Sequence, residues 1–219
     1  MIARLIKWGA IAAIAYPIMQ LTAQGLIQVG GREPAFTASA QEILEFFQNR
    51  DTTLFSIGGY LSALSVIAFL WFLGALWSEL RRAERDSGWV SVIAIGSGLV
   101  AASAYNVGGW SLALFRINEG LDPQIAQLLF DEGNFNFANT WISLGSMLLA
   151  AGIVFREAGT YPKWLGGGSI LLAVGLILGR ALWTSQIAFL PYTLFWVWMI
   201  AFGIYLLRHP HKDERGNNE

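Results

Sequence analysis

The chain alternates long apolar stretches with short clusters of charged residues. Six stretches contain about 20 or more mostly apolar residues, the length that a helix needs to cross the hydrocarbon core of a bilayer. They cover residues 5–28, 53–77, 89–114, 135–155, 164–183 and 187–207. Strands that cross a membrane would be shorter and would alternate in polarity. The pattern therefore predicts an all-α, polytopic membrane bundle with about six transmembrane helices, spanning residues 1–208.

Two of the connections between these stretches carry signals for short amphipathic helices. Ser39 and Glu42 have the spacing of a capping box, ahead of an apolar group at residues 43–47. Asp122 and Pro123 form an N-cap followed by proline at the first helical position, and Gly133 is a plausible stop. We expect both helices to lie at the outer interface of the membrane. They could shield the ends of the spans, or they could cover a site as a lid.

The distribution of lysine and arginine predicts the orientation. In a six-span arrangement, ten basic residues fall on one side: Arg4, Lys7, Arg81, Arg82, Arg85, Arg156, Lys163, Arg208, Lys212 and Arg215. Four fall on the other side: Arg32, Arg50, Arg116 and Arg180. Cytoplasmic loops carry the excess of basic residues. We therefore expect a multi-pass protein of the cell membrane with both termini in the cytoplasm, an uncleaved first span, and a disordered cytoplasmic tail over residues 209–219.

Composition agrees with this prediction and excludes several chemistries. The chain has 219 residues, of which 55% are hydrophobic and only 13% charged, and its mean hydropathy is +0.49. Soluble domains usually carry about 25% charged residues. The net charge of −1 gives no basic footprint for a nucleic-acid partner. Cysteine is absent, and the two histidines, His209 and His211, follow the last span. We expect no catalytic residue, no metal and no cofactor.

The candidate chemistry is a set of polar residues in the outer half of the spans. The members selected as a possible ligand site are Gln24, Tyr60, Tyr105, Asn106, Asn139 and Arg180. Buried amides and hydroxyls in lipid need hydrogen-bond partners, so these residues should face the interior of the bundle. Two interpretations stay open. The residues could join helices through hydrogen bonds, or they could line an outward-facing pocket.

Arg180 is the sharpest single feature of this set. An arginine within a span is costly and suggests a functional site by default. Its guanidinium could snorkel to the headgroups or pair with Asp51, Asp131 or Glu132. It could instead bind an anionic group, because its forked donors fit a carboxylate or a phosphate.

Small residues indicate where helices approach one another. Gly175 and Gly179 form a GxxxG motif in the fifth stretch. Such motifs mark close helix contacts in membranes. We expect contacts within the chain, and a homodimer seam is the alternative.

One segment, residues 153–166, resembles a known family. It runs Phe155-Arg-Glu-Ala-Gly159, then Pro162-Lys-Trp-Leu-Gly166. This is similar to the cytoplasmic turn of a bacterial family of six-span integral membrane proteins of unknown function. The resemblance covers about fourteen residues and the six-span layout. It implies a topology and no activity.

Three functions remain after these exclusions. The first is a non-enzymatic protein that binds or passes a small ligand, anionic or lipidic, through an outward-facing polar pocket. The second is an accessory or sensor subunit of a membrane complex. The third is a membrane enzyme acting on lipid, which the sequence supports least because no nucleophile with an activating base is visible at membrane depth.

Overall fold

The structure is a computed structural model that describes residues 2–84, 87–104 and 108–209. All regular elements in these ranges are helices. Their order is α1 (Ile2–Ile27), α2 (Ala40–Gln48), α3 (Thr52–Ala83), α4 (Trp89–Ala104), α5 (Gly108–Arg116), η1 (Ile117–Glu119), α6 (Pro123–Ala158), η2 (Trp164–Gly168), α7 (Ser169–Ala181), η3 (Gln186–Ala188) and α8 (Phe189–Arg208). The tail predicted for residues 209–219 lies outside the described residues except for His209.

Six helical segments are long and apolar enough to cross a membrane, and they coincide with the six predicted spans. The prediction of an all-α membrane bundle is therefore confirmed. The third span is described as two helices, α4 and α5, on either side of residues 105–107, which lie outside the described part of the chain. The second and fourth spans are longer than predicted, because α3 and α6 continue past their apolar segments into charged ends.

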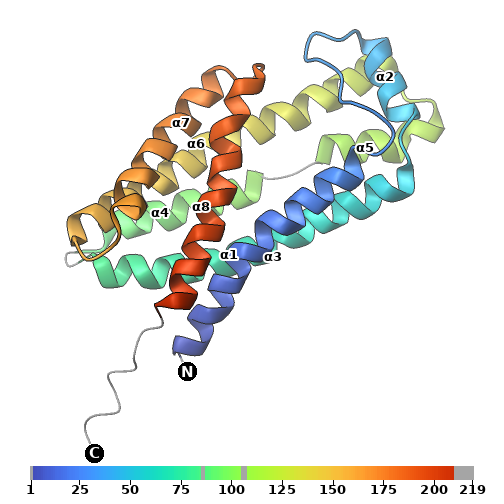
Figure 1. Cartoon of the computed structure of the whole chain (residues 1–219). Coiled ribbons are helices and arrows are strands. Elements are labelled where there is room, and N and C mark those ends of the chain that lie inside the picture. The colour runs from blue at the N-terminus through green and yellow to red at the C-terminus, as the bar shows by residue number, and fades with distance from the viewer. Residues whose placement is uncertain (1, 85–86, 105–107, 210–219) are drawn as a thin grey trace, which may run out of the picture.

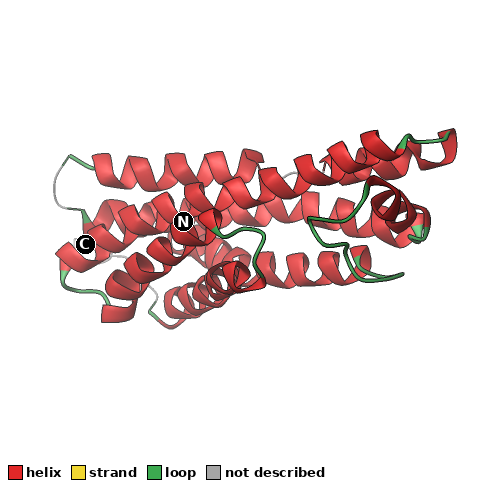
Figure 2. Cartoon of the chain, turned by 90° about the horizontal axis from the view of Figure 1, so that it is seen from above, coloured by secondary structure: helices red, strands yellow, loops and turns green. Residues whose placement is uncertain are grey.

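The long helices α1, α3 and α6 run along one long axis, which α8 crosses at an angle, and the bundle has two distinct ends (Figures 1 and 2). One end holds both chain termini, and we call it the termini end. The other end holds α2 and the long loop before it, and we call it the α2 end. Described basic residues gather at the termini end, because α1 and α4 begin there and α3, α6 and α8 end there. They are Lys7, Arg81, Arg82, Arg156, Lys163 and Arg208.

One of the two predicted amphipathic helices forms as expected. In α2, the Ser39 side chain accepts a hydrogen bond from the Glu42 backbone N–H, and Glu42 accepts one from the Ser39 backbone N–H. Its apolar residues Ile43, Leu44 and Phe47 are buried. They pack in a cluster with residues of α5 and α6, so α2 lies against the bundle rather than free at an interface.

The prediction of a second, separate amphipathic helix was wrong. The capping by Asp122 and Pro123 is present, but the helix continues through Gly133 to Ala158 as α6. Gly133 lies inside α6, at a point where another helix packs closely against it. A Cβ at this position would lie 2.7 Å from the Trp110 ring, so glycine allows the indole of α5 to lie directly against α6.

The helices approach closely where one of them presents a small residue. A Cβ on Gly58 of α3 would lie 2.8 Å from the carbonyl oxygen of Ala23 in α1. The GxxxG motif of α7 is used within the chain. Gly175 packs against Pro191, and Gly179 packs against the backbone of Ala188. Small residues let backbones approach and gain van der Waals contact, which is the main attraction between helices in lipid.

Candidate functional site

A cavity of about 230 Å³ lies at the α2 end of the bundle, between the end of α1, the first half of α6 and the beginning of α8. Five aromatic side chains form much of its wall: Trp110, Phe137, Phe189, Tyr192 and Trp196. Its polar lining comes from Gln24, Gln28, Glu33, Asn134 and Thr193. Aromatic walls with a few convergent polar groups are typical of a small-molecule site, and this volume is small for one.

Glu33 gives the cavity its ionisable group. It lies in the loop between α1 and α2, and burial among apolar groups raises its pKa from 4.5 to about 7. The Asn134 amide and the positive charge of Arg50 lower the pKa in part but do not cancel the effect of burial. No described basic side chain lies within 4.0 Å of this carboxyl group. The carboxyl group therefore changes charge near neutral pH and lacks a described ion-pair partner.

Arg50 holds the loop that carries Glu33. Its Nη1 donates to the carbonyl oxygens of Ile27, at 3.3 Å, and Val29, at 3.1 Å. These carbonyls lie at the C-terminal end of α1, where backbone acceptors are left without helical partners. The guanidinium also stacks over the Phe46 ring of α2, 4.0 Å from its centroid. One buried arginine thus joins α1, α2 and the loop.

The aromatic wall is fixed by packing behind it. The Trp110 ring stacks on Phe130 with centroids 5.4 Å apart, and Phe46 and Phe47 of α2 meet its edge. Its indole N–H donates to the Phe130 carbonyl oxygen at 3.4 Å. The indole N–H of Trp196 is buried and has no acceptor among the described residues. Trp110 is therefore a rigid part of the wall.

The structure separates the residues that sequence selected as one site. Gln24 lines the cavity. Arg180 and Asn139 do not line it. They bond to each other across α7 and α6, with Arg180 Nε donating to Asn139 Oδ1 at 2.8 Å. Tyr60 is 68% exposed on the flank of α3 and is not brought to the others. Tyr105 and Asn106 lie outside the described residues.

Sequence reasoning missed the central group of the cavity. Glu33 stands in a loop between glycines and a proline, without a helical or motif pattern to indicate burial. Asn134 was assigned to a connection, and only the continuity of α6 past Gly133 turns it toward the cavity. The one sequence feature that could have pointed to this region was Arg50, because few basic residues occur on the predicted outer side of the membrane.

A second buried polar group lies at the termini end. Glu79 of α3 is fully buried and pairs with Arg82 at 3.3 Å. The Tyr161 hydroxyl donates to Glu79 Oε2 at 3.1 Å. Burial and then the Glu79 charge raise the pKa of Tyr161, so this hydroxyl stays a donor at physiological pH. The contact ties the turn between α6 and α7 to α3.

Removing this hydroxyl should measurably weaken the fold. We expect Tyr161→Phe to lower the free energy of unfolding by about 2 kcal/mol, because a hydrogen bond to a buried carboxylate is lost. Chemical denaturation of the detergent-solubilised protein measures this. Tyr60→Phe is the matched control, since an exposed hydroxyl should change stability by less than about 0.5 kcal/mol. Equal effects of the two variants would contradict the assignment.

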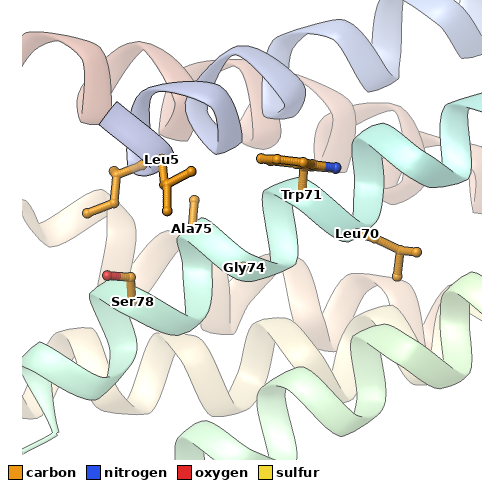
Figure 3. A pocket seen from close by; sticks show the side chains of 7 residues that line it. Leu5, Leu70, Trp71, Gly74, Ala75 and Ser78 are labelled. Carbon is orange, nitrogen blue, oxygen red and sulfur yellow. The ribbon is translucent and has the colours of Figure 1, made fainter. Parts of the chain in front are cut away.

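Another hollow, of about 460 Å³, lies on the flank of α1 and α3 near the termini end (Figure 3). Leu5, Leu70, Trp71 and Gly74 line it, together with Ala75 and Ser78. Its lining contains no charged side chain. Trp71 is 51% exposed, which suits a surface turned toward lipid. The groove can accommodate an acyl chain, but nothing in it recognises a polar ligand.

Fold and cavity define the class as a six-helix, multi-pass membrane protein with an aromatic-walled cavity at one end. Comparisons of the chain with protein-family models, with curated proteins and with solved structures give no match. Among the described residues, no group of three or more His, Asp or Glu side chains could hold a metal ion. The cavity is therefore the main structural indication of function.

Proposed function

We propose that this protein binds a small cationic ligand, carrying an amine or a quaternary ammonium group, in the cavity at the α2 end. The observation that carries the proposal is a carboxyl group, Glu33, within a cavity whose walls are five aromatic side chains. Aromatic faces attract cations through their quadrupoles, and such cages recognise ammonium groups. A bound cation would form a direct ion pair with Glu33, in addition to the longer-range charge of Arg50.

A cationic ligand replaces the anionic one expected from sequence. That expectation depended on Arg180, which bonds to Asn139 and does not line the cavity. The Gln24 and Gln28 amides remain for polar atoms elsewhere on the ligand. The cavity therefore suits a compact molecule with one positive charge and one or two hydrogen-bonding atoms.

Packing below the cavity favours binding over passage. Toward the termini end, the core contains Phe69, Phe72, Leu76 and Phe202, each at most 3% exposed. These side chains belong to one continuous apolar cluster. A hydrated cation would lose its water in such a region without compensation. A receptor or sensor that responds to its ligand fits this arrangement better than a channel.

The proposal places the cavity on the outer side of the cell membrane. The described basic residues gather at the termini end, and short loops rich in lysine and arginine stay in the cytoplasm. Gln28 and Thr193 at the cavity rim are exposed at the α2 end. A ligand would therefore enter from outside the cell.

Binding of tetramethylammonium chloride to the detergent-solubilised protein tests this function. Isothermal titration at pH 8 should show saturable binding, whereas sodium pivalate, an anion of similar shape, should not bind. Glu33→Gln should weaken tetramethylammonium binding by about tenfold or more, because the charge partner is removed. Trp196→Leu should also weaken binding, because a cation–π contact is lost.

Glu119→Gln is the matched control. Glu119 is an exposed carboxylate at the same end, paired with Arg116 and distant from the cavity lining. This variant should bind tetramethylammonium as the original chain does. Preferential binding of pivalate, or equal binding by Glu33→Gln, would overturn the proposal.

A further inference from the structure

A second hollow at the α2 end, separate from the cavity, contains both charge and aromatic surface. It is an open groove of about 700 Å³ between α6, the loop before α2 and the turn after α7. Asp131, Glu132 and Phe135 of α6 line it, together with Phe36, Trp183 and Thr184. The rings of Phe36 and Trp183 lie 4.6 Å apart, and those of Phe135 and Trp183 lie 5.8 Å apart. We call this the headgroup groove.

Arg180 is not itself part of the lining of the headgroup groove, but it lies against two of the rings that line it. Its guanidinium is 4.5 Å from the Phe135 ring centroid and 5.9 Å from that of Trp183. Its Nε is bonded to Asn139, and no described carboxylate lies within 4.0 Å. The pairing with Asp51, Asp131 or Glu132 that sequence left open is not formed in the described structure. The terminal nitrogens of the guanidinium thus have no described protein acceptor.

The depths at which the negative charge on α6 and the positive charge of Arg180 on α7 lie indicate the kind of ligand. Asp131 lies one helical turn before Phe135 and so nearer the α2 end, while Arg180 lies over Phe135 and bonds one turn deeper. In a phospholipid with a zwitterionic headgroup, the phosphate is the deeper group and the amine lies farther out. We infer that the headgroup groove binds a zwitterionic phospholipid, with its phosphate on Arg180 and its amine on the neighbouring carboxylates of Asp131 and Glu132.

The surroundings suit the remainder of such a lipid. Phe135 lines the headgroup groove, is 47% exposed and lies one helical turn deeper than Asp131. It offers apolar surface to the part of the lipid below the headgroup. Phe36 and Trp183 offer ring faces to the ammonium group, and aromatic residues are common at the headgroup level. A guanidinium that donates to a phosphate forms strong, charge-assisted hydrogen bonds.

Native mass spectrometry of the full chain in a mild detergent tests the inference. The delipidated protein is titrated with three lipids that share dioleoyl chains: phosphatidylethanolamine, phosphatidylglycerol and diacylglycerol. Phosphatidylethanolamine should bind most tightly, about tenfold above diacylglycerol. Arg180→Gln should reduce its binding to the diacylglycerol level, and the double variant Asp131→Asn, Glu132→Gln should reduce it to the phosphatidylglycerol level.

Three controls keep the test decisive. Arg208→Gln removes an exposed charge at the termini end and should leave lipid preference unchanged. Arg180→Lys keeps the charge and should retain most of the binding, even if Arg180→Gln fails to fold. Millimolar inorganic phosphate should not compete with the lipid. Equal binding of phosphatidylglycerol and phosphatidylethanolamine by the original chain, or effective competition by phosphate, would overturn the inference.

Discussion

Glu33→Gln is expected to make the protein more stable above neutral pH and to flatten the dependence of its stability on pH. In the folded chain, burial raises the pKa of Glu33 from 4.5 to about 7. Between these two values the folded state holds a proton that the unfolded state has released. The free energy of unfolding must therefore fall as the pH rises from about 4.5 through 7.

The size of this effect makes it measurable. Each pKa unit corresponds to about 1.4 kcal/mol, so Glu33 should cost up to about 3 kcal/mol of stability at pH 8 relative to pH 4. Glutamine keeps the shape and cannot ionise. Chemical denaturation of the two chains in the same detergent at pH 4, 6 and 8 should show curves that diverge as the pH increases.

Glu45→Gln serves as the matched control for this series. Glu45 is an exposed carboxylate on α2, at the same end of the bundle. Its removal should leave the slope of stability against pH as in the original chain. A Glu33→Gln variant that keeps the original slope would show that Glu33 is not buried as described. Saturating tetramethylammonium should also reduce the slope, because a bound cation favours the ionised carboxylate.

Gly203→Leu is expected to disrupt the contact between α8 and α1. A Cβ at position 203 would lie 2.6 Å from the Ala10 carbonyl oxygen and 2.9 Å from an Ile14 side-chain carbon. The nearer atom belongs to backbone, so one whole helix must shift to make room. Overpacking of this kind should lower the free energy of unfolding by about 3 kcal/mol or more. Thermal unfolding and size-exclusion chromatography of the solubilised protein measure the loss.

Gly74→Leu is the control for the added volume. Gly74 also lies within a spanning helix, but a Cβ there would meet nothing within 4 Å, and the residue opens onto the flank groove of Figure 3. This variant should fold normally and change stability by less than about 1 kcal/mol. Similar losses in both variants would point to a general intolerance of leucine and not to the α1–α8 contact.

The polar residues at the α2 end could be predicted from the sequence only in part. Sequence reasoning selected the α2 end of the bundle and included Gln24, which does line the cavity. It grouped Arg180 with Gln24 because both are polar and lie at similar depth. Depth follows from position along a span, but the face of a helix that meets a given neighbour depends on how helices are packed around one another. In the structure Gln24 lines the cavity, whereas Arg180 bonds to Asn139 and lies against the Phe135 ring.

The position of the loop before α2 likewise depends on contacts that the local sequence does not reveal. Its own residues carry no pattern that predicts burial, and Glu33 is charged, which favours solvent. Its position depends on Arg50, which lies 17 positions further along the chain and bonds to carbonyls at the end of α1. Local sequence contains the end of α1 and the capping box of α2, but not their contact.

By itself, the sequence determined the number of spans, the helical class and the ends at which charged residues gather. These properties depend on the length and polarity of single segments, because a bilayer demands about 20 apolar residues and internally satisfied backbone for each crossing. Only the tertiary structure decided that α6 continues through Gly133, that Glu33 lines an aromatic-walled cavity, and that Arg180 bonds to Asn139 and lies against Phe135. Each of these depends on contacts between segments distant in the chain, where close packing selects the neighbours.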